Sequence, residues 1–85
     1  MRMMLVGAGA VGESILKVMK WRDPNGTWLE YVLVCDFEQK RAQEVVDKLD
    51  GDDRFEAGAV NATEKEAMMR MIRIHQIDFL MDAAP

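Results

Sequence analysis

Residues 3–12, Met3-Met4-Leu5-Val6-Gly7-Ala8-Gly9-Ala10-Val11-Gly12, are the stretch that decides the fold of this chain. A short apolar run stopped by a glycine is typical of a strand that is buried on both faces. The glycines that follow have the spacing G-x-G-x-x-G. Beyond them, apolar residues recur at helical spacing and predict a helix to about Trp21, with one apolar stripe made of Val11, Ile15, Val18 and Met19. A strand, a glycine-rich loop and a helix in this order predict the start of a βαβ unit.

The rest of the chain continues the alternation of strands and helices. Further strands are predicted over residues 29–35, 55–60 and 77–82, and the second of these, rich in glycine and alanine, is placed at a sheet edge. A second helix is predicted over residues 42–49. A third helix follows what looks like a capping box of Thr63 and Glu66, and its apolar face consists of Ala67, Met68, Met71 and Ile72.

The predicted order is therefore βαβαβαβ. Because each connection is helical and long enough for a parallel crossover, the strands should form a parallel sheet in the order 3-2-1-4. The first two helices should cover one face and the third helix the other. This is a Rossmann-like α/β fold, with residues 1–85 as one dinucleotide-binding domain. Since the full doubly wound order adds two further strands, we expect the unit to be incomplete and cut after its fourth strand.

The glycine loop predicts a site for a dinucleotide. Gly7 allows a tight turn out of the strand, Gly9 lets the backbone approach a pyrophosphate, and Gly12 lets helix and strand pack closely. The N-terminus of the following helix presents free N–H groups and a partial positive charge to the phosphates. The alternative is a glycine-rich turn that binds nothing.

Asp36, at the end of the second predicted strand, indicates which dinucleotide binds. A carboxylate there can accept hydrogen bonds from both ribose hydroxyls and repel a 2′-phosphate, which favours NAD. Lys40 and Arg41 lie one helical turn further on and could reach a 2′-phosphate, so NADP is possible. The simpler interpretation of this pair is a solvated helix face, and the simpler role for Asp36 is a helix N-cap.

Composition excludes several other classes of protein. The 85 residues carry 11 Lys and Arg against 15 Asp and Glu, a net charge of −4 that gives no basic surplus for nucleic acid. No apolar run is long enough for a membrane segment or a signal peptide, so we expect a cytoplasmic protein. One cysteine, Cys35, and one histidine, His75, cannot form a disulfide or a zinc site. Asp52 and Asp53 lie in a turn, where we expect solvated carboxylates.

With these motifs in place, the whole chain resembles the N-terminal nucleotide-binding domain of the saccharopine dehydrogenase family. The resemblance rests on the glycine loop, on Val34-Cys35-Asp36, on the segment 59–63 and on Asp82-Ala83-Ala84-Pro85. It implies an NAD(P)-dependent oxidoreductase of amino-acid metabolism, with Asn61 and Ala62 near the adenine and residues 83–85 near the nicotinamide-side ribose. The cofactor-binding residues expected in all are Gly7, Ala8, Gly9, Ala10, Val11, Gly12, Asp36, Asn61, Ala62, Ala83, Ala84 and Pro85.

Three functions remain open at this point. The chain could be the cofactor-binding part of an amino-acid dehydrogenase whose substrate domain is absent, a regulatory nucleotide sensor of the kind that gates potassium transport, or a fold that binds nothing. No catalytic residue is assigned, because His75 and Tyr31 fall at the wrong end of the predicted sheet, and the chain alone should not turn over substrate. The open edge at Phe79-Leu80-Met81 should lead to self-association or to packing against the absent domain.

Overall fold

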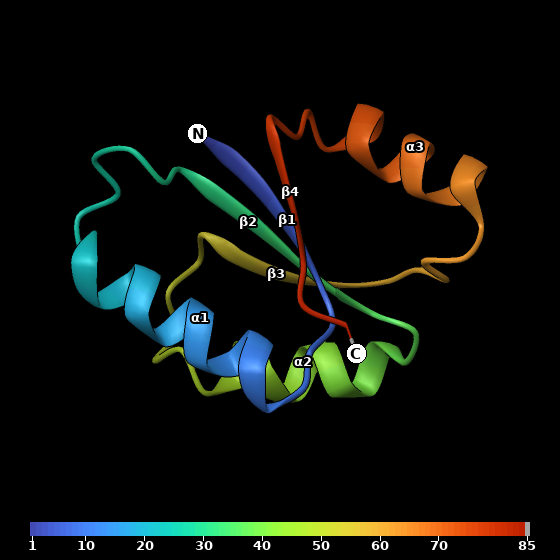
Figure 1. The fold of residues 1–85 in the computed structure, drawn as a ribbon. Coiled ribbons are helices and arrows are strands. Elements are labelled where there is room, and N and C mark those ends of the chain that lie inside the picture. The colour runs from blue at the N-terminus through green and yellow to red at the C-terminus, as the bar shows by residue number, and fades with distance from the viewer. Residues whose placement is uncertain (85) are drawn as a thin grey trace.

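The computed structural model describes residues 1–84 and contains strands and helices in strict alternation (Figure 1). The elements are β1 (Arg2–Val6), α1 (Ala10–Arg22), β2 (Tyr31–Asp36), α2 (Gln39–Asp47), β3 (Phe55–Ala59), α3 (Lys65–Ile74) and β4 (Phe79–Asp82). Within the described residues, no helix has the length and apolar character needed to cross a membrane.

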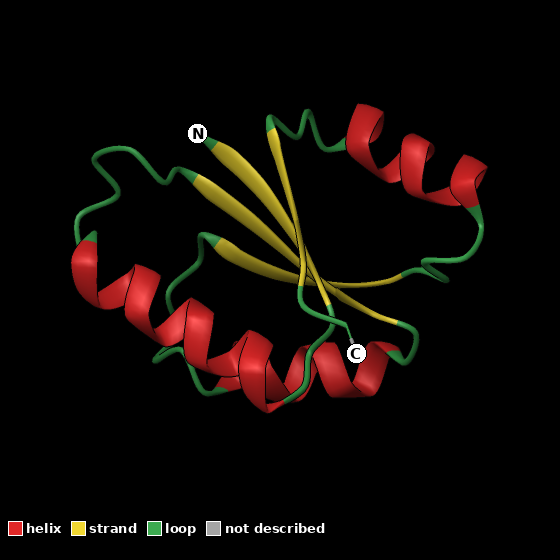
Figure 2. Cartoon of the chain, viewed as in Figure 1, coloured by secondary structure: helices red, strands yellow, loops and turns green. Residues whose placement is uncertain are grey.

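The four strands form one parallel sheet in the order β3-β2-β1-β4, as the sequence predicts. Leu5 of β1 pairs with Val34 of β2 on one side and with Met81 of β4 on the other. Figure 2 shows α1 and α2 on one face of the sheet and α3 on the opposite face. The predicted Rossmann-like α/β architecture is therefore confirmed over the described part of the chain.

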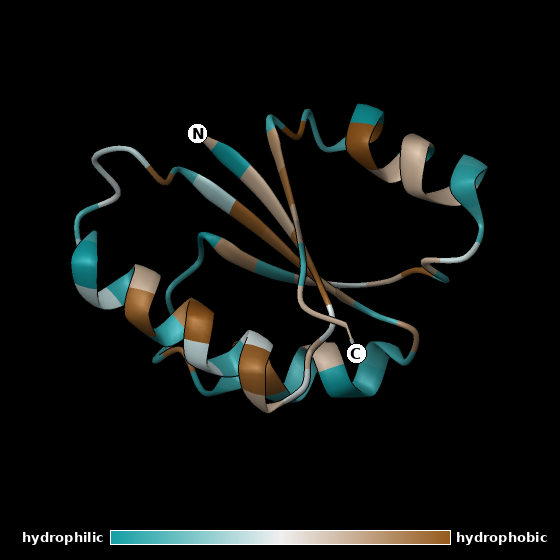
Figure 3. Ribbon diagram, in the orientation of Figure 1, coloured by the Kyte–Doolittle hydropathy of each residue, from teal (hydrophilic) through white to brown (hydrophobic). Residues whose placement is uncertain are grey.

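Each face of the sheet has its own hydrophobic core. The first core is formed by Met3, Leu5, Val32 and Val34 of the strands with Leu16 of α1 and Ala42, Val45 and Leu49 from α2 and the residues just after it. The second core, beneath α3, contains Met4, Val6, Leu33 and Cys35, with Met68 and Met71 only partly buried against it. In Figure 3 hydrophobic colour appears along the strands and on α1, whereas α3 begins with hydrophilic colour and carries hydrophilic and hydrophobic colour side by side at its end.

The rotation of α1 differs from the sequence prediction. Gly12 and Leu16 are its buried residues, whereas Val11 and Val18 are 64 % and 52 % exposed. A Cβ on Gly12 would collide with the carbonyl oxygen of Gly7, so this side of the helix lies directly against the loop. The close contact at Gly12 turns Leu16 inward and Val18 outward, and the prediction of a core stripe through Val11 and Val18 is wrong.

The start of α3 also differs from the prediction. Its N-cap residue is Glu64, which makes no capping hydrogen bond through its side chain. The backbone N–H and the hydroxyl of Thr63 both donate to Asn61 Oδ1, at 3.0 and 2.7 Å. The capping box of Thr63 and Glu66 is therefore not formed, because Asn61 holds Thr63 in a local turn before the helix begins.

A buried polar network closes the end of the sheet opposite the glycine loop. The Asp23 carboxylate, 2 % exposed, accepts hydrogen bonds from the backbone N–H groups of Thr27, Trp28 and Leu29. Arg54 donates to the carbonyl oxygens of Asp23 and Leu29 and pairs with Asp52 at 2.7 Å. The expectation of a solvated Asp52 is therefore wrong: its side chain is only 13 % exposed, because Arg54 holds it.

Candidate functional site

A cleft of about 780 Å³ lies at the carboxyl ends of the strands. It is formed by the glycine loop and the end of β2, at the centre of the sheet, and by the residues after β3 and β4, the two edge strands. Figure 1 shows the last described residues close to the loop between β1 and α1. The cleft is lined by Val6, Gly7, Gly9, Ala10, Val11, Asp36, Phe37, Arg41, Val60, Asn61, Ala62, Thr63, Asp82, Ala83 and Ala84.

Gly7 is required by its backbone angle and by a crossing segment of chain. Its φ of +108° lies in the region that favours glycine, and its N–H donates to the Cys35 carbonyl at 2.8 Å. A Cβ at this position would lie 2.6 Å from the backbone nitrogen of Ala84. The segment after β4 is held there because the Ala83 N–H donates to the Val6 carbonyl at 2.7 Å. The structure thus gives Gly7 a second role: it makes room for the far wall of the cleft.

Gly9 differs from the other two glycines of the motif because a side chain added there would meet no backbone and only the end of one flexible side chain. The nearest atom to a Cβ built there is Arg41 Nη2, at 3.7 Å. Gly9 is the N-cap residue of α1 and offers no side-chain cap, and the first bond of the helix runs from the Glu13 N–H to the Gly9 carbonyl. By helix geometry the N–H groups before Glu13 have no intrahelical acceptor. They form the kind of donor group that binds phosphate at helix N-termini.

The Asp36 carboxylate anchors the glycine loop. Its Oδ2 accepts the N–H of Ala8 at 2.9 Å, its Oδ1 accepts the N–H of Glu38 at 3.2 Å, and the residue is only 8 % exposed. Burial alone would raise the pKa of Asp36, but these backbone hydrogen bonds and the charge of Arg41 outweigh it and lower the pKa. Asp36 is not the N-cap of α2, since that position belongs to Glu38. It therefore carries a negative charge at the rim of the cleft.

Arg41 lines the cleft, whereas the simpler interpretation of the sequence placed it on a solvated face of the helix. It lies in the first turn of α2, and its guanidinium reaches toward Gly9 and lowers the pKa of Asp36. Its neighbour Lys40 does not line the cleft. In the sequence, the position of Arg41 one helical turn beyond Asp36 indicated that its side chain could reach the cofactor site. That position alone could not show whether the long side chain points into the cleft or toward solvent.

The other predicted residues fall into two groups. The structure brings most of them to the cleft, including Asn61, Ala62, Ala83 and Ala84. Ala8 and Gly12 do not line it: Ala8 is buried under Asp36, and Gly12 is buried against the loop. Pro85 lies outside the described residues. Sequence reasoning did not assign to the site five further residues at or just beyond the ends of predicted strands, although three of them lie in the segments that carry the family resemblance: Val6, Phe37, Val60, Thr63 and Asp82.

The cleft can bind but offers little for proton transfer. Among its described lining residues there is no histidine, lysine, tyrosine or cysteine. Cys35 is completely buried, and burial raises the pKa of its thiol to about 12. The arrangement suits recognition of phosphate, ribose and a flat ring, with one carboxylate and one guanidinium at the rim.

Comparison with known proteins agrees with this geometry. Residues 3–85 match the family described as saccharopine dehydrogenase NADP binding domain. A comparison with individual curated proteins found no match. The family match covers the glycine loop, Asp36, Arg41 and both segments that close the cleft, and it confirms the resemblance noted from the motifs. The chain belongs to the family of saccharopine dehydrogenase NADP-binding domains, a domain family from NADP-dependent oxidoreductases.

Proposed function

We propose that the cleft holds the cofactor of an amino-acid oxidoreductase of the saccharopine dehydrogenase type, with the pyrophosphate over the N-terminus of α1. The observation that carries this proposal is that Gly9 faces the cleft with only the mobile end of Arg41 near it, beside helix N–H groups that have no intrahelical acceptor. Gly7 and Gly12 are enclosed by the protein itself, so among the three motif glycines only Gly9 leaves its backbone open to a ligand.

The remaining segments then contact the rest of the dinucleotide. Asp36 and Arg41 stand at the adenine-ribose end, and Asn61 and Ala62 stand beside the adenine. The segment Ala83-Ala84 forms the opposite wall, toward the nicotinamide. This assignment follows the strand order, because a dinucleotide lies across the carboxyl ends of the strands where the order reverses, between β1 and β4.

We propose NADP rather than NAD as the better ligand. Asp36 already accepts a backbone hydrogen bond on each carboxylate oxygen, which leaves it less free to bind ribose hydroxyls. Arg41 lines the cleft, and a guanidinium can bind a 2′-phosphate through two parallel hydrogen bonds. The preference for NAD expected from Asp36 is the competing prediction.

The pyrophosphate position is tested by Gly9→Val, with Glu44→Val on the exposed face of α2 as the matched control. NADPH binding, measured by calorimetry, should be lost in the first variant and unchanged in the second. Both variants should keep the circular dichroism of the unaltered chain, because neither new side chain meets protein atoms closely. Undiminished binding by the Gly9 variant would place the phosphates elsewhere.

The choice of cofactor is tested by Arg41→Gln, with Lys40→Gln as the control from the next residue. We expect Arg41→Gln to weaken NADPH binding about tenfold or more and to leave NADH within about twofold, since about 1.4 kcal/mol corresponds to each factor of ten. Lys40→Gln should change neither. Tighter binding of NADH than of NADPH by the unaltered chain would favour Asp36 as the determinant and contradict our assignment.

Residues 1–85 alone should bind the cofactor without turnover. Hydride transfer needs positioned acid and base groups beside the nicotinamide, and the described lining residues provide none of the usual ones. Incubation with NADP and a panel of amino acids that includes saccharopine and lysine should give no NADPH absorbance above the control without protein. A nucleotide sensor would also bind the cofactor without turnover. Steady turnover that scales with protein concentration would therefore exclude the sensor alternative, and it would also contradict our prediction that residues 1–85 are inactive alone.

A further inference from the structure

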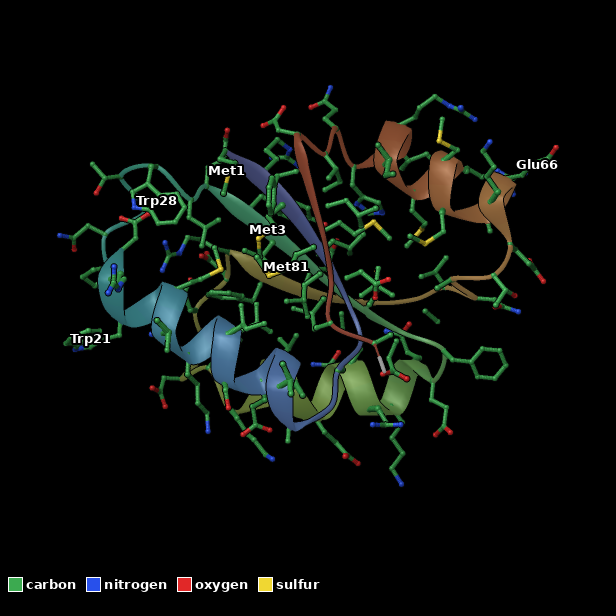
Figure 4. All side chains as sticks on the ribbon, viewed as in Figure 1. Met1, Met3, Trp21, Trp28, Glu66 and Met81 are labelled. Carbon is green, nitrogen blue, oxygen red and sulfur yellow. The ribbon has the colours of Figure 1, made fainter. Side chains whose placement is uncertain are left out.

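One aromatic side chain lies at the end of the sheet where the cleft opens. The chain contains two Trp, one Tyr and three Phe. Three of these residues begin strands, and because the sheet is parallel they lie at its other end: Tyr31, Phe55 and Phe79. Figure 4 shows Trp21 and Trp28 at the end of α1 that lies away from the glycine loop. Phe37, directly after β2, is therefore the only aromatic residue among the described lining residues of the cleft.

The Phe37 ring belongs to neither hydrophobic core. The residue is 72 % exposed, and it packs neither into the core under α1 and α2 nor into the core beneath α3. Exposure alone says little, because single apolar side chains are common on protein surfaces. Its position gives the ring its importance, since Phe37 stands at the rim of the cleft between Asp36 and the N-cap of α2. A ligand in the cleft can cover this ring without breaking up a packed core.

The backbone on either side of Phe37 is held in place. The Val60 N–H donates to the Asp36 carbonyl at 3.0 Å, so the segment after β3 is bonded to the end of β2. On the other side, Gln39 Nε2 donates to the Ala57 carbonyl at 3.3 Å and ties the start of α2 to β3. Phenylalanine has only two side-chain torsions, so a ring on this fixed support loses little conformational entropy when a ligand covers it.

The proposed cofactor brings a flat ring to this part of the cleft, a step that rests on the proposed function. In a dinucleotide the adenine is bonded directly to the ribose that we assign to Asp36 and Arg41. The register of the sheet pairs Asp36 with Ala59, so the residues that follow these two positions flank one stretch of the cleft. Phe37 follows Asp36, and the segment 60–62 follows Ala59. The adenine would therefore lie between Phe37 and this segment.

We propose that the Phe37 ring stacks on the adenine of the cofactor. Adenine and phenylalanine both present flat π faces, and stacking of a base on an aromatic side chain is favourable in water without any polar partner. The other described lining residues offer apolar and polar contacts but no second ring. Phe37 therefore supplies the adenine contact, whereas Arg41 stays available for the 2′-phosphate. Adenosine 2′,5′-bisphosphate carries both groups and is the part of NADP that this arrangement recognises.

The ring is tested by Phe37→Ala and Phe37→Tyr, with Trp21→Ala as the control at a position that is 78 % exposed and away from the cleft. Calorimetry measures the binding of NADPH and of adenosine 2′,5′-bisphosphate. We expect Phe37→Ala to weaken the binding of both ligands about tenfold or more, the usual size of a lost base stack. Phe37→Tyr keeps a ring and should stay within about twofold, and Trp21→Ala should not change binding. Because both positions are exposed, every variant should keep the circular dichroism of the unaltered chain.

The two ligands separate a failure of this inference from a failure of the cofactor assignment. If the unaltered chain binds neither ligand, the proposed function is wrong and the stacking falls with it. If the unaltered chain binds both ligands and Phe37→Ala binds them equally well, the cofactor assignment stands and the stacking is refuted. A loss in Phe37→Ala that is confined to NADPH would place Phe37 beside the nicotinamide, because the bisphosphate lacks that half of the cofactor. Such a result would also overturn the proposal.

Proton NMR detects the stack directly. The adenine ring protons of bound adenosine 2′,5′-bisphosphate should move upfield, because they lie over the ring current of Phe37. Nuclear Overhauser effects should join these protons to a phenylalanine ring in the unaltered chain and in Trp21→Ala, and should be absent in Phe37→Ala. Phe55 is buried and Phe79 lies at the opposite end of the sheet, so neither can supply this signal. Effects that persist in Phe37→Ala would assign the contact to another ring and contradict the proposal.

Discussion

The two halves of this domain are covered to very different extents. In β1 and β2 nearly every residue is buried, and α1 and α2 each place at least two fully buried residues against them. In the other half, α3 has no buried residue, and β4 is exposed at all but one position. Both halves contribute walls to the cleft. The wall that would hold the phosphates is therefore built on the well-packed half, and the opposite wall on the exposed half.

A polar cluster compensates in part for the sparse packing of α3. The Tyr31 hydroxyl donates to Glu56 Oε1 at 2.6 Å and lies 3.1 Å from Nδ1 of His75, the C-cap residue of α3. The Arg2 guanidinium lies over the Tyr31 ring, 4.3 Å from its centroid, and donates from Nε to the His75 carbonyl at 3.0 Å. The end of α3 is thus tied to β1 and β2 by hydrogen bonds rather than by buried apolar area.

The largest expected effect compares two buried glycines, Gly12 against the glycine loop and Gly58 of β3 beneath Met71 of α3. Gly12→Ala would drive a methyl group into the backbone carbonyl of Gly7, which cannot yield, so we expect the free energy of unfolding to fall by about 3 kcal/mol or more. Gly58→Ala would meet the ends of Leu33 and Met71 at 3.3 Å, which are side chains able to shift, so its cost should stay below about 1 kcal/mol. Urea unfolding measures the loss of stability in both variants, and equal losses would show that the packing of α3 over Gly58 is as rigid as the contact between Gly12 and Gly7.

A second comparison removes one leucine from each half. Leu5 is completely buried in β1, and Leu5→Ala should lower the free energy of unfolding by about 3 kcal/mol. Leu80 is 43 % exposed in β4, and Leu80→Ala should cost less than about 1 kcal/mol. The same urea titration reads both variants. A large loss at Leu80 would mean that β4 is covered in solution.

Tyr31→Phe tests whether the polar cluster fixes α3. The change removes only the hydroxyl shared by Glu56 and His75, and should cost about 1 kcal/mol, the usual net value of a hydrogen bond. Burial and the hydrogen bond to Glu56 raise the pKa of Tyr31, so the hydroxyl stays protonated at any pH where the protein is studied. Hydrogen exchange should accelerate in α3 and not in α1. An equal acceleration of hydrogen exchange in α1 and α3 would contradict a role of the Tyr31 hydroxyl that is confined to α3.

The last comparison is confined to acid and concerns Asp23 in the well-packed half. Burial alone would raise the pKa of this carboxyl, but the hydrogen bonds from Leu29, Thr27 and Trp28 lower it from 3.8 to about 2. Because the folded state has the lower pKa, the carboxylate stabilises it fully above about pH 4, and the contribution is lost as the pH falls toward 2. The difference in urea midpoint between the unaltered chain and Asp23→Asn should shrink over this range. A constant difference would rule out Asp23 as the titrating group.

The sequence by itself determined the order of the elements, the strand order and the position of the glycine loop. It could do so because these depend on local patterns: apolar runs, helical spacing, and glycines at the junction of strand and helix. The position of Asp36 at the end of β2 was fixed in the same way. Each of these features involves neighbours within a few residues along the chain or follows from the handedness of parallel crossovers.

Only the tertiary structure decided which side of α1 faces the sheet and where the charged groups of the cleft point. Two apolar stripes on α1 satisfy the same helical period, and the contact between Gly12 and Gly7 selects the one that contains Leu16. The bond from Ala8 to Asp36 joins residues 28 positions apart, and it turns the carboxylate toward the loop. Arg41 enters the cleft because Gly9 leaves space for its guanidinium. These outcomes depend on contacts between distant segments, which no periodicity along the chain encodes.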